Sequence, residues 1–463
     1  MTSRVRWRVT GLVLAAMCGG CSSGSHAAGV TPADAGDDTD GDSGGAFTSS
    51  RPGDQWEGET HLAVSASGQV AAVWIADQAS YIGYAFSSDS GSTWTPAQAL
   101  HAPSSGDEAW DPAVAVDAAN NFYVSFLALG ANARVYVAEA PTGTMTFGAP
   151  SEVTDPVESG LDDDGGKPLF WYDKPWIAVT RDQGVVVTYT RFDGCHAPFV
   201  PGSCVADVML GRSTNGASWT RTAITASASG DGGKYGGFAE SAFPCVSAST
   251  GRLWVVYDSI EPPGAAGTPP VGVVLQYSDD GGATWSAGNT TVVAPATATG
   301  VLDGPSCAGD GMDVWVEYEL ADPNGTFASS IQVARSANGG QSFGAPVNAQ
   351  DMATSAHSWH GAIALESSGE LDVEYYGGAD EGDPQGSVYY THSTGGGATW
   401  GKAQLIKSPI TLTSKSGGDI GSLSTWLGDY LGVTTAGGVL YTTYTDNASG
   451  TAHVAFAKQS VPP

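Results

Sequence analysis

Apolar and polar positions along this chain follow one pattern seven times over: an apolar strand, a tight turn and a second apolar strand. The segments are rich in Val, Ile, Tyr and Trp, and Gly, Asn or Asp stand at the turns, as in β-hairpins. Further strands follow each hairpin, as YIGYAFS and TWTPAQAL do in the first unit. No amphipathic helix of useful length competes, so the sequence predicts an all-β protein of four-stranded units. The hairpins are expected at His61–Ile75, Pro112–Leu127, Pro175–Thr190, Pro244–Asp258, Pro305–Glu319, Gly361–Tyr376 and Asp429–Thr445.

A second phrase joins the third strand of a unit to its fourth. It reads Ser-x-Asp-x-Gly-x-Thr-Trp at Ser87–Trp94 and Ser278–Trp285, and weaker copies lie at Ser213–Trp219, Ser336–Phe343 and Ser393–Trp400. Ser and Asp side chains can bond backbone N–H groups two residues on and thereby close a turn. We therefore interpret the phrase as a hairpin clasp and not as a set of catalytic acids.

The clasp resembles the Asp-box, the bacterial neuraminidase repeat of sialidase-like β-propellers. A repeat at this spacing is typical of a propeller, in which four-stranded blades surround an axis. Seven units predict seven four-stranded blades, with the six-bladed sialidase fold as the alternative. The last unit ends after one further strand, Ala452–Lys458, so we expect Ala46–Trp56 to supply its outer strand and close the ring.

The first residues read as an export signal. Arg4, Arg6 and Arg8 precede a short apolar run, Val9–Met17, which is too short to span a membrane. Cys21 follows two glycines, as at a bacterial lipoprotein cleavage site; cleavage before Cys18 and an ordinary secreted protein are the alternatives. The sequence thus divides into a lipoprotein signal peptide (1–20), a disordered acidic Gly/Ser/Asp tether (21–45) and the propeller (46–463). We expect a lipoprotein of the cell envelope, on the outer membrane or the cell surface.

Four cysteines remain after Cys18 and Cys21 are set aside. An even number in an exported chain indicates disulfides. Cys195 and Cys204 flank one loop, and Cys245 and Cys307 occupy similar places in successive repeats. The predicted pairs are therefore Cys195–Cys204 and Cys245–Cys307.

The strong negative charge of the chain limits the kinds of molecule that it can bind. The formal net charge is −30, which repels nucleic acid and anionic membranes. We expect a monomer that meets the membrane only through its lipid and whose partner is a glycan or a glycoprotein.

The candidate site lies where the innermost strands begin, on the face that carries the long connections. Polar and aromatic residues gather at these positions and would surround the mouth of the axial channel. The candidate catalytic residues are Glu59, Asp111, Asp173, Arg191, Glu240, His360, Asp429 and Tyr430. The candidate glycan-stacking rings are Trp110, Trp176, Trp359 and Trp426, and packing between blades is the alternative for each.

The sialidase resemblance implies three arginines that clamp the substrate carboxylate, a Tyr–Glu nucleophile pair and an Asp acid/base. Arg51 and Arg191 are the only arginines that we place on the working face, so the clamp is incomplete. Tyr430, with Glu240 or Glu59, would stand for the nucleophile pair. The phrases DKPWIAV and WLGDYLGV resemble those of uncharacterised bacterial proteins labelled exo-α-sialidase. Three functions stay open: glycan binding alone, glycoside hydrolysis by two acids, and polyuronate elimination with His360 or His357 as base and Tyr430 as acid.

One long loop carries three consecutive carboxylates, Asp162, Asp163 and Asp164. Hard oxygen ligands of this kind suit Ca²⁺, the one cofactor that the sequence suggests. The spacing does not match an EF-hand loop, and a solvated acidic turn is the favoured alternative.

The proposed anchor can be tested directly. Because the lipid would be attached to Cys21, Cys21→Ala should move the protein from the membrane fraction to the soluble fraction. Fractionation, together with sequencing of the mature N-terminus, measures this. A variant that stays in the membrane fraction would contradict the assignment.

Overall fold

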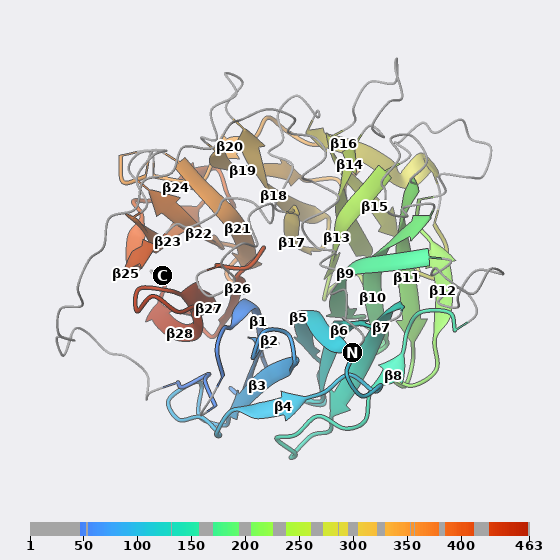
Figure 1. The fold of residues 1–463 in the computed structure, drawn as a ribbon. Coiled ribbons are helices and arrows are strands. Elements are labelled where there is room, and N and C mark those ends of the chain that lie inside the picture. Colours follow the sequence, from blue (N-terminus) through green and yellow to red (C-terminus); the bar gives the residue numbers. More distant parts are fainter. Residues whose placement is uncertain are drawn as a thin grey trace, which may run out of the picture.

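A computed structural model describes most of the chain from residue 47 onward (Figure 1). Cys21, the acidic loop of Asp162, Asp163 and Asp164, and the pair Cys195 and Cys204 lie outside the described residues. Within the described part, no helix is long and apolar enough to span a bilayer. The described residues are 47–51, 54–130, 132–156, 170–193, 205–225, 238–260, 272–285, 287–294, 304–321, 329–351, 353–355, 357–378, 385–411 and 426–461.

Seven blades form a ring, which confirms the predicted β-propeller (Figure 1). Blade one contains β1 (Gly58–Val64), β2 (Val70–Ala76), β3 (Tyr81–Ser87) and β4 (Gln98–Leu100). Blade two contains β5 (Glu108–Val116), β6 (Phe122–Leu129), β7 (Ala133–Ala140) and β8 (Ser151–Glu152). Blade three contains β9 (Phe170–Val179), β10 (Val185–Asp193), β11 (Val205–Ser213) and β12 (Thr220–Ala223). Blade four contains β13 (Phe238–Val246), β14 (Leu253–Ile260), β15 (Gly272–Ser278) and β16 (Thr290–Ala294), and the short helix η1 (Ala287–Asn289) directly precedes β16. Blade five contains β17 (Ser306–Asp310), β18 (Asp313–Ala321), β19 (Ser329–Ser336) and β20 (Val347–Asn348). Blade six contains β21 (His357–Leu365), β22 (Leu371–Gly378), β23 (Gln385–Thr394), β24 (Thr399–Trp400) and β25 (Gln404–Thr411). Blade seven contains β26 (Gly432–Ala436), β27 (Val439–Asp446) and β28 (His453–Ser460).

The first strand of each blade lies innermost. These strands contact one another in sequence around the axis, and β26 of blade seven contacts β1 to complete the ring. The second and third strands are covered on both sides by neighbouring blades, so all residues of β2, β3 and β15 are buried. This double burial explains why these strands read as continuous apolar runs instead of alternating ones.

The clasp turns have the hydrogen bonds that the sequence predicted. Ser87 Oγ donates to Asp89 Oδ1 over 2.8 Å, and Asp89 Oδ1 accepts the backbone N–H of Thr93 over 2.7 Å. The Thr93 hydroxyl and backbone and Ser87 hold the pKa of Asp89 at about 2. Asp280 makes the same contacts in blade four, so these carboxylates are structural.

The seam between the last and first blades is closed mainly by side chains. Trp56 stacks on Trp426, with ring centroids 5.2 Å apart, and its Nε1 donates to the Trp426 carbonyl over 3.3 Å. The Glu57 N–H donates to the Ala452 carbonyl over 3.1 Å, and the Glu57 carboxylate accepts the N–H of Val454 over 3.0 Å. Glu57 is fully buried, so these bonds connect two blades out of contact with water.

This seam corrects the expected fourth strand of blade seven. Within the described residues that blade has three strands, with β28 at its edge, and residues 47–51 and 54–57 form no strand. The segment is instead held by Phe47, whose ring lies 4.8 Å from that of Trp94, and by Ser50 Oγ, which lies 2.8 Å from His453 Nδ1. A large ring and side-chain hydrogen bonds do here what a paired strand was expected to do.

The predicted disulfide between Cys245 and Cys307 is confirmed, with Cα atoms 5.9 Å apart. Cys245 lies on β13 and Cys307 on β17, so the bond joins the innermost strands of blades four and five. The pairing of Cys195 with Cys204 stays a prediction.

The seam predicts a large effect for one substitution. Trp56 is 1% exposed, so Trp56→Ala leaves a cavity between two blades and should lower the free energy of unfolding by about 3–5 kcal/mol. Denaturant unfolding followed by circular dichroism measures this change. Leu405→Ala is the control, because Leu405 is 55% exposed and should change stability by no more than about 0.5 kcal/mol. Equal effects of the two substitutions would contradict the importance of the seam.

Candidate functional site

A β-bulge recurs near the start of the innermost strand in five blades. Two residues of that strand face one residue of the next strand, and the first of the two has left-handed backbone angles. Positive φ is uncommon outside glycine, and bulges redirect side chains. The residues concerned, with φ in parentheses, are Glu59 (43°), Asp111 (51°), Lys174 (48°), Ser241 (55°) and His360 (53°).

Lys174 is the centre of a charged group at the axis, which we call the lysine cluster: Lys174, Glu59, Asp111, Asp173 and Asp429. Lys174 Nζ lies 3.2 Å from Glu59 Oε1, 3.3 Å from Asp111 Oδ1 and 2.7 Å from Asp429 Oδ2. The three acids come from blades one, two and seven, and the lysine comes from blade three. The Glu59 and Asp111 side chains are 0% and 1% exposed, whereas Asp429 is 21% exposed. Asp429 is therefore the acid of this ion-paired set that a ligand can reach.

The buried acids of the lysine cluster divide into two kinds. Burial raises the pKa of Glu59 and of Asp173 well above their usual values, and the neighbouring Asp111 raises both further. Burial acts on Asp111 in the same direction, but the Lys174 ammonium and hydrogen bonds from Glu59 and Asp173 outweigh it and lower the Asp111 pKa. The raised pKa values of Glu59 and Asp173 favour their neutral forms, in which each can donate a hydrogen bond to the Asp111 carboxylate.

Glu240 stands beside the lysine cluster on blade four. Burial raises the pKa of Glu240 to about 7; Lys174 opposes the rise, and Asp429 and Asp111 add to it. A carboxyl group with this pKa exchanges its proton near neutral pH, as a general acid must.

Aromatic rings form one wall of the mouth. The Trp176 ring lies 4.7 Å from that of Phe243, 4.8 Å from that of Tyr430 and 5.2 Å from that of His61. The Tyr430 hydroxyl donates to the Pro112 carbonyl over 3.0 Å, which fixes this ring. Burial lowers the pKa of His61 to about 4, so its imidazole is neutral at neutral pH.

A hollow of about 50 Å³ opens between this wall and the lysine cluster. It is lined by Lys174, Trp176, Asp429, Tyr430 and His360, among others. That volume holds one or two water molecules, so a sugar would have to lie across the mouth instead of entering the channel. A larger hollow of about 920 Å³ beside blade seven has Lys458 as its single charged lining residue and offers no convergent acids.

The structure corrects three of the expected stacking rings. Trp110, Trp359 and Trp426 are only 8%, 3% and 6% exposed, because they pack between blades. Trp110 and Trp426 both lie against Trp56. Of the four tryptophans, Trp176 is the one that lines the hollow.

Arg191 does not join the lysine cluster or line the hollow. Its Nη2 lies 3.4 Å from Asp207 Oδ2, and its guanidinium lies over the Phe170 ring. The other predicted site residues gather at the mouth: Glu59, Asp111, Asp173, Asp429, Tyr430, Glu240 and His360. The sequence also places Lys174 at the start of an innermost strand, but it gives no reason to expect that Lys174 is the centre of the charged cluster. Aligning the starts of the innermost strands would have supplied one, since Glu59, Asp111 and Lys174 occupy one repeat position on successive blades.

No family model and no curated protein matches the chain. Similar solved structures include a protein of unknown function from Dyadobacter fermentans, with 14% identity, a TM-score of 0.49 and coverage of 78% of this chain and 96% of that one. A Hadza microbial sialidase has 13% identity and a TM-score of 0.45, over 88% of this chain and 66% of its own. An ulvan lyase of a polysaccharide lyase family has 14% identity and a TM-score of 0.49, over 77% of this chain and 82% of its own. Likeness at this level assigns no activity, so function must be argued from the site.

The lysine cluster predicts a pH-dependent effect. Lys174→Met leaves buried carboxyl groups without their counter-charge, which should lower the free energy of unfolding by about 3–5 kcal/mol near pH 8. Glu59, Asp173 and Glu240 have raised folded-state pKa values, so they stabilise the fold at low pH, and this contribution is lost as pH rises. Without Lys174 these pKa values rise further, so the loss should shrink toward about pH 5.

Denaturant unfolding at the two pH values measures this effect. Lys402→Met is the matched control, because Lys402 is exposed and should change stability by no more than about 0.5 kcal/mol. A Lys174→Met penalty that is constant with pH would refute the ionic role.

Proposed function

We propose that the mouth of the axial channel binds an uncharged glycan. The observation that carries this proposal is the meeting of the Trp176–Tyr430 wall with the partly exposed acids Asp429 and Glu240. An aromatic ring offers a flat apolar face, and a carboxylate beside it offers strong acceptors for hydroxyl groups. Sugars present both surfaces at once, an apolar face of C–H groups and a rim of hydroxyls.

Charge selects against an anionic glycan. Lys174 is already engaged by three acidic side chains, and Glu240 adds another acid, so the mouth carries no free positive charge among the described residues. No described arginine lines the hollow, and a bidentate carboxylate clamp depends on arginine. A sialoside or a polyuronate would therefore meet repulsion here.

The same argument weighs against elimination. His360 and Tyr430 both line the hollow, as a base and an acid would. However, the Tyr430 hydroxyl already donates to the Pro112 carbonyl, and burial raises the Tyr430 pKa further above its usual value. A lyase is therefore not favoured, because its anionic substrate would find no counter-charge here and because the Tyr430 hydroxyl is already hydrogen-bonded within the fold.

Glycoside hydrolysis is the second candidate, and Glu240 favours it. With a pKa of about 7, Glu240 could donate a proton to a leaving oxygen near neutral pH. Asp429, held by Lys174 and partly exposed, would be the second carboxylate that this chemistry requires. The proposed setting for either function is the cell envelope, with the propeller tethered through a lipid on Cys21.

Binding is tested by a glycan array and then by calorimetry on the best uncharged ligand. Trp176→Ala should weaken that ligand by about 2 kcal/mol, or roughly thirtyfold, because it removes the accessible ring of the wall. Trp400→Ala is the matched control, since Trp400 lies in a clasp far from the mouth and should leave affinity unchanged. The proposal fails if the wild-type protein binds no glycan, or if the two variants lose affinity equally.

Hydrolysis is tested separately on the bound glycans, with a fluorogenic sialoside alongside. We expect little or no release of sialic acid, and Arg191→Ala should not change this result. If an uncharged glycan is cleaved, Glu240→Gln should lower kcat by about 100-fold or more, while binding persists. Glu139→Gln, an acid on the clasp side, serves as the control. Robust sialoside turnover would overturn the charge argument.

A further inference from the structure

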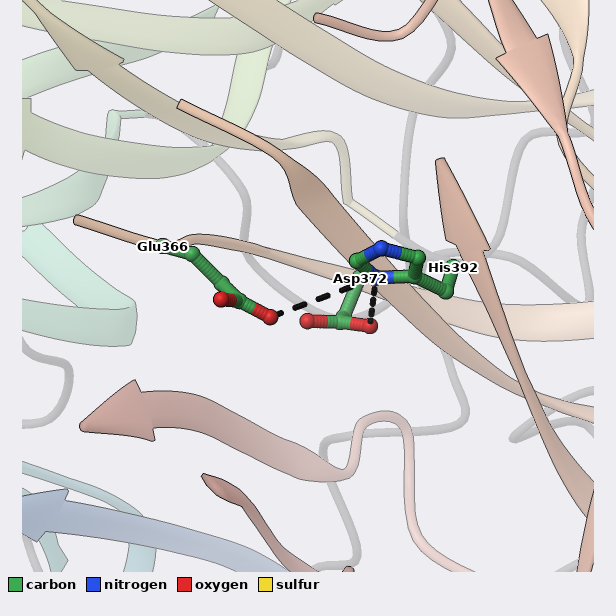
Figure 2. A group of neighbouring side chains, drawn as sticks. All are labelled: Glu366, Asp372 and His392. Atoms are coloured by element: carbon green, nitrogen blue, oxygen red, sulfur yellow. Dashed lines mark hydrogen bonds and ion pairs between the residues drawn. The ribbon is translucent and has the colours of Figure 1, made fainter. Parts of the chain in front are cut away.

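A second group of ionisable side chains lies in blade six, away from the mouth (Figure 2). We call it the blade-six triad: Glu366, Asp372 and His392. Glu366 follows the far end of β21, Asp372 lies near the start of β22, and His392 lies near the end of β23. The mouth residue His360 lies near the other end of β21, so the triad belongs to the clasp side of the ring.

The three side chains converge out of contact with most of the solvent. His392 Nδ1 lies 3.0 Å from Asp372 Oδ1 and 3.9 Å from Glu366 Oε1, and the side chains are 9%, 0% and 8% exposed. One ligand atom from each lies within 4.8 Å of the other two. Figure 2 shows both carboxyl groups pointing toward the imidazole and toward each other.

Two oxygens of the triad lack a nitrogen or hydroxyl donor among the described residues. Glu366 Oε1 and Asp372 Oδ2 are buried, and neither accepts a hydrogen bond from a nitrogen or hydroxyl donor of the described residues. A hydrogen bond between the two carboxyl groups requires a proton on one of them. A buried carboxylate oxygen without a partner is costly, and a nearby cation is one way to satisfy it. The lysine cluster of the mouth has Lys174 for this purpose, but no lysine or arginine forms a described ion pair with the triad.

We propose that the blade-six triad is a binding site for a divalent transition-metal ion, with Zn²⁺ as the best match. One imidazole nitrogen with two carboxylates suits zinc, whereas calcium prefers oxygen ligands alone. A tetrahedral zinc ion at about 2.1 Å from its ligands holds them about 3.4 Å apart. The two described distances from His392 Nδ1, 3.0 Å and 3.9 Å, lie on either side of that value.

Metal binding would exchange protons for the ion. His392 would bind through Nδ1 as neutral imidazole with its proton on Nε2, and both carboxyl groups would be ionised. A proton shared by the Asp372 and Glu366 carboxyl groups would leave as the ion binds. Three protein ligands leave at least one position for water.

The place of the triad explains what such an ion would do. The clasp of blade six has Gly395 where other clasps have Asp or Asn, so it lacks the side-chain oxygen that closes those turns. Glu370 replaces it only with long contacts, 3.4 Å to the Gly395 N–H and 3.5 Å to the Gly396 N–H. An ion on Glu366, Asp372 and His392 would tie the β21–β22 turn to the end of β23, directly before this weak clasp. The role is structural.

The test uses the untagged full chain, stripped with a chelator and with its disulfides intact. Zn²⁺ should bind with a stoichiometry of about one by calorimetry and raise the midpoint of thermal unfolding, and the chelator should reverse both effects. Ca²⁺ should do neither at this site. His392→Gln and Glu366→Gln should each weaken Zn²⁺ at least about tenfold. Two controls should keep wild-type affinity: Glu370→Gln in the same turn, and His453→Gln, which removes a histidine that faces one acid instead of two.

A Co²⁺ spectrum keeps the proposal testable if the variants fold poorly. Wild-type protein should show d–d bands of a nitrogen and oxygen site and no thiolate charge-transfer band. A thiolate band would assign the ion to the cysteines and overturn the proposal. So would the absence of Zn²⁺ binding by the wild-type protein, or equal affinity in His392→Gln and the controls.

Discussion

The ammonium group of Lys174 connects four blades across the axis. It extends from blade three to acids of blades one, two and seven and is the cation that offsets their negative charge. Desolvation alone raises the pKa of Glu59, Asp111 and Asp173 and so favours their neutral forms. The Lys174 ammonium and hydrogen bonds from Glu59 and Asp173 favour the charged form of Asp111. The mouth is therefore a polar network that is stable only as a unit.

This network limits what the mouth can recognise. The Lys174 ammonium is already paired with acids of the protein, so an anionic ligand finds no counter-charge at the described mouth. Asp429 and Glu240 still offer hydrogen-bond acceptors beside Trp176. A site that binds carboxylates would need a cation free of internal partners, and the described mouth has none. The same ionic contacts that hold the blades together thus support the proposal of an uncharged ligand.

The blade-six triad shows what happens without such a cation. Two buried carboxyl groups and an imidazole lie together, and two of the carboxyl oxygens accept no hydrogen bond from a nitrogen or hydroxyl donor of the described residues. The contrast between the two clusters is one of charge and not of burial, because both are largely closed to solvent. An exogenous ion would give the triad what Lys174 gives the mouth.

The sequence by itself determined the repeat and therefore the ring. Apolar runs with polar turns define hairpins locally, and seven of them with clasps such as Ser87–Trp94 leave few alternatives to a propeller. It also located the mouth, because the residues before each innermost strand share one position in the repeat, and it paired Cys245 with Cys307 for the same reason. The repeat could not show that Trp110, Trp359 and Trp426 face neighbouring blades while Trp176 faces the hollow.

Tertiary structure decided the rest. The side-chain seam at Trp56 and Glu57, the partners of Lys174 and the meeting of Glu366 with Asp372 and His392 all depend on distances between segments far apart in the chain. A local pattern of polar and apolar residues determines which face of a strand is buried. The local pattern does not determine which side chain of another blade or strand will lie opposite. The charge balance of each cluster depends on that side chain.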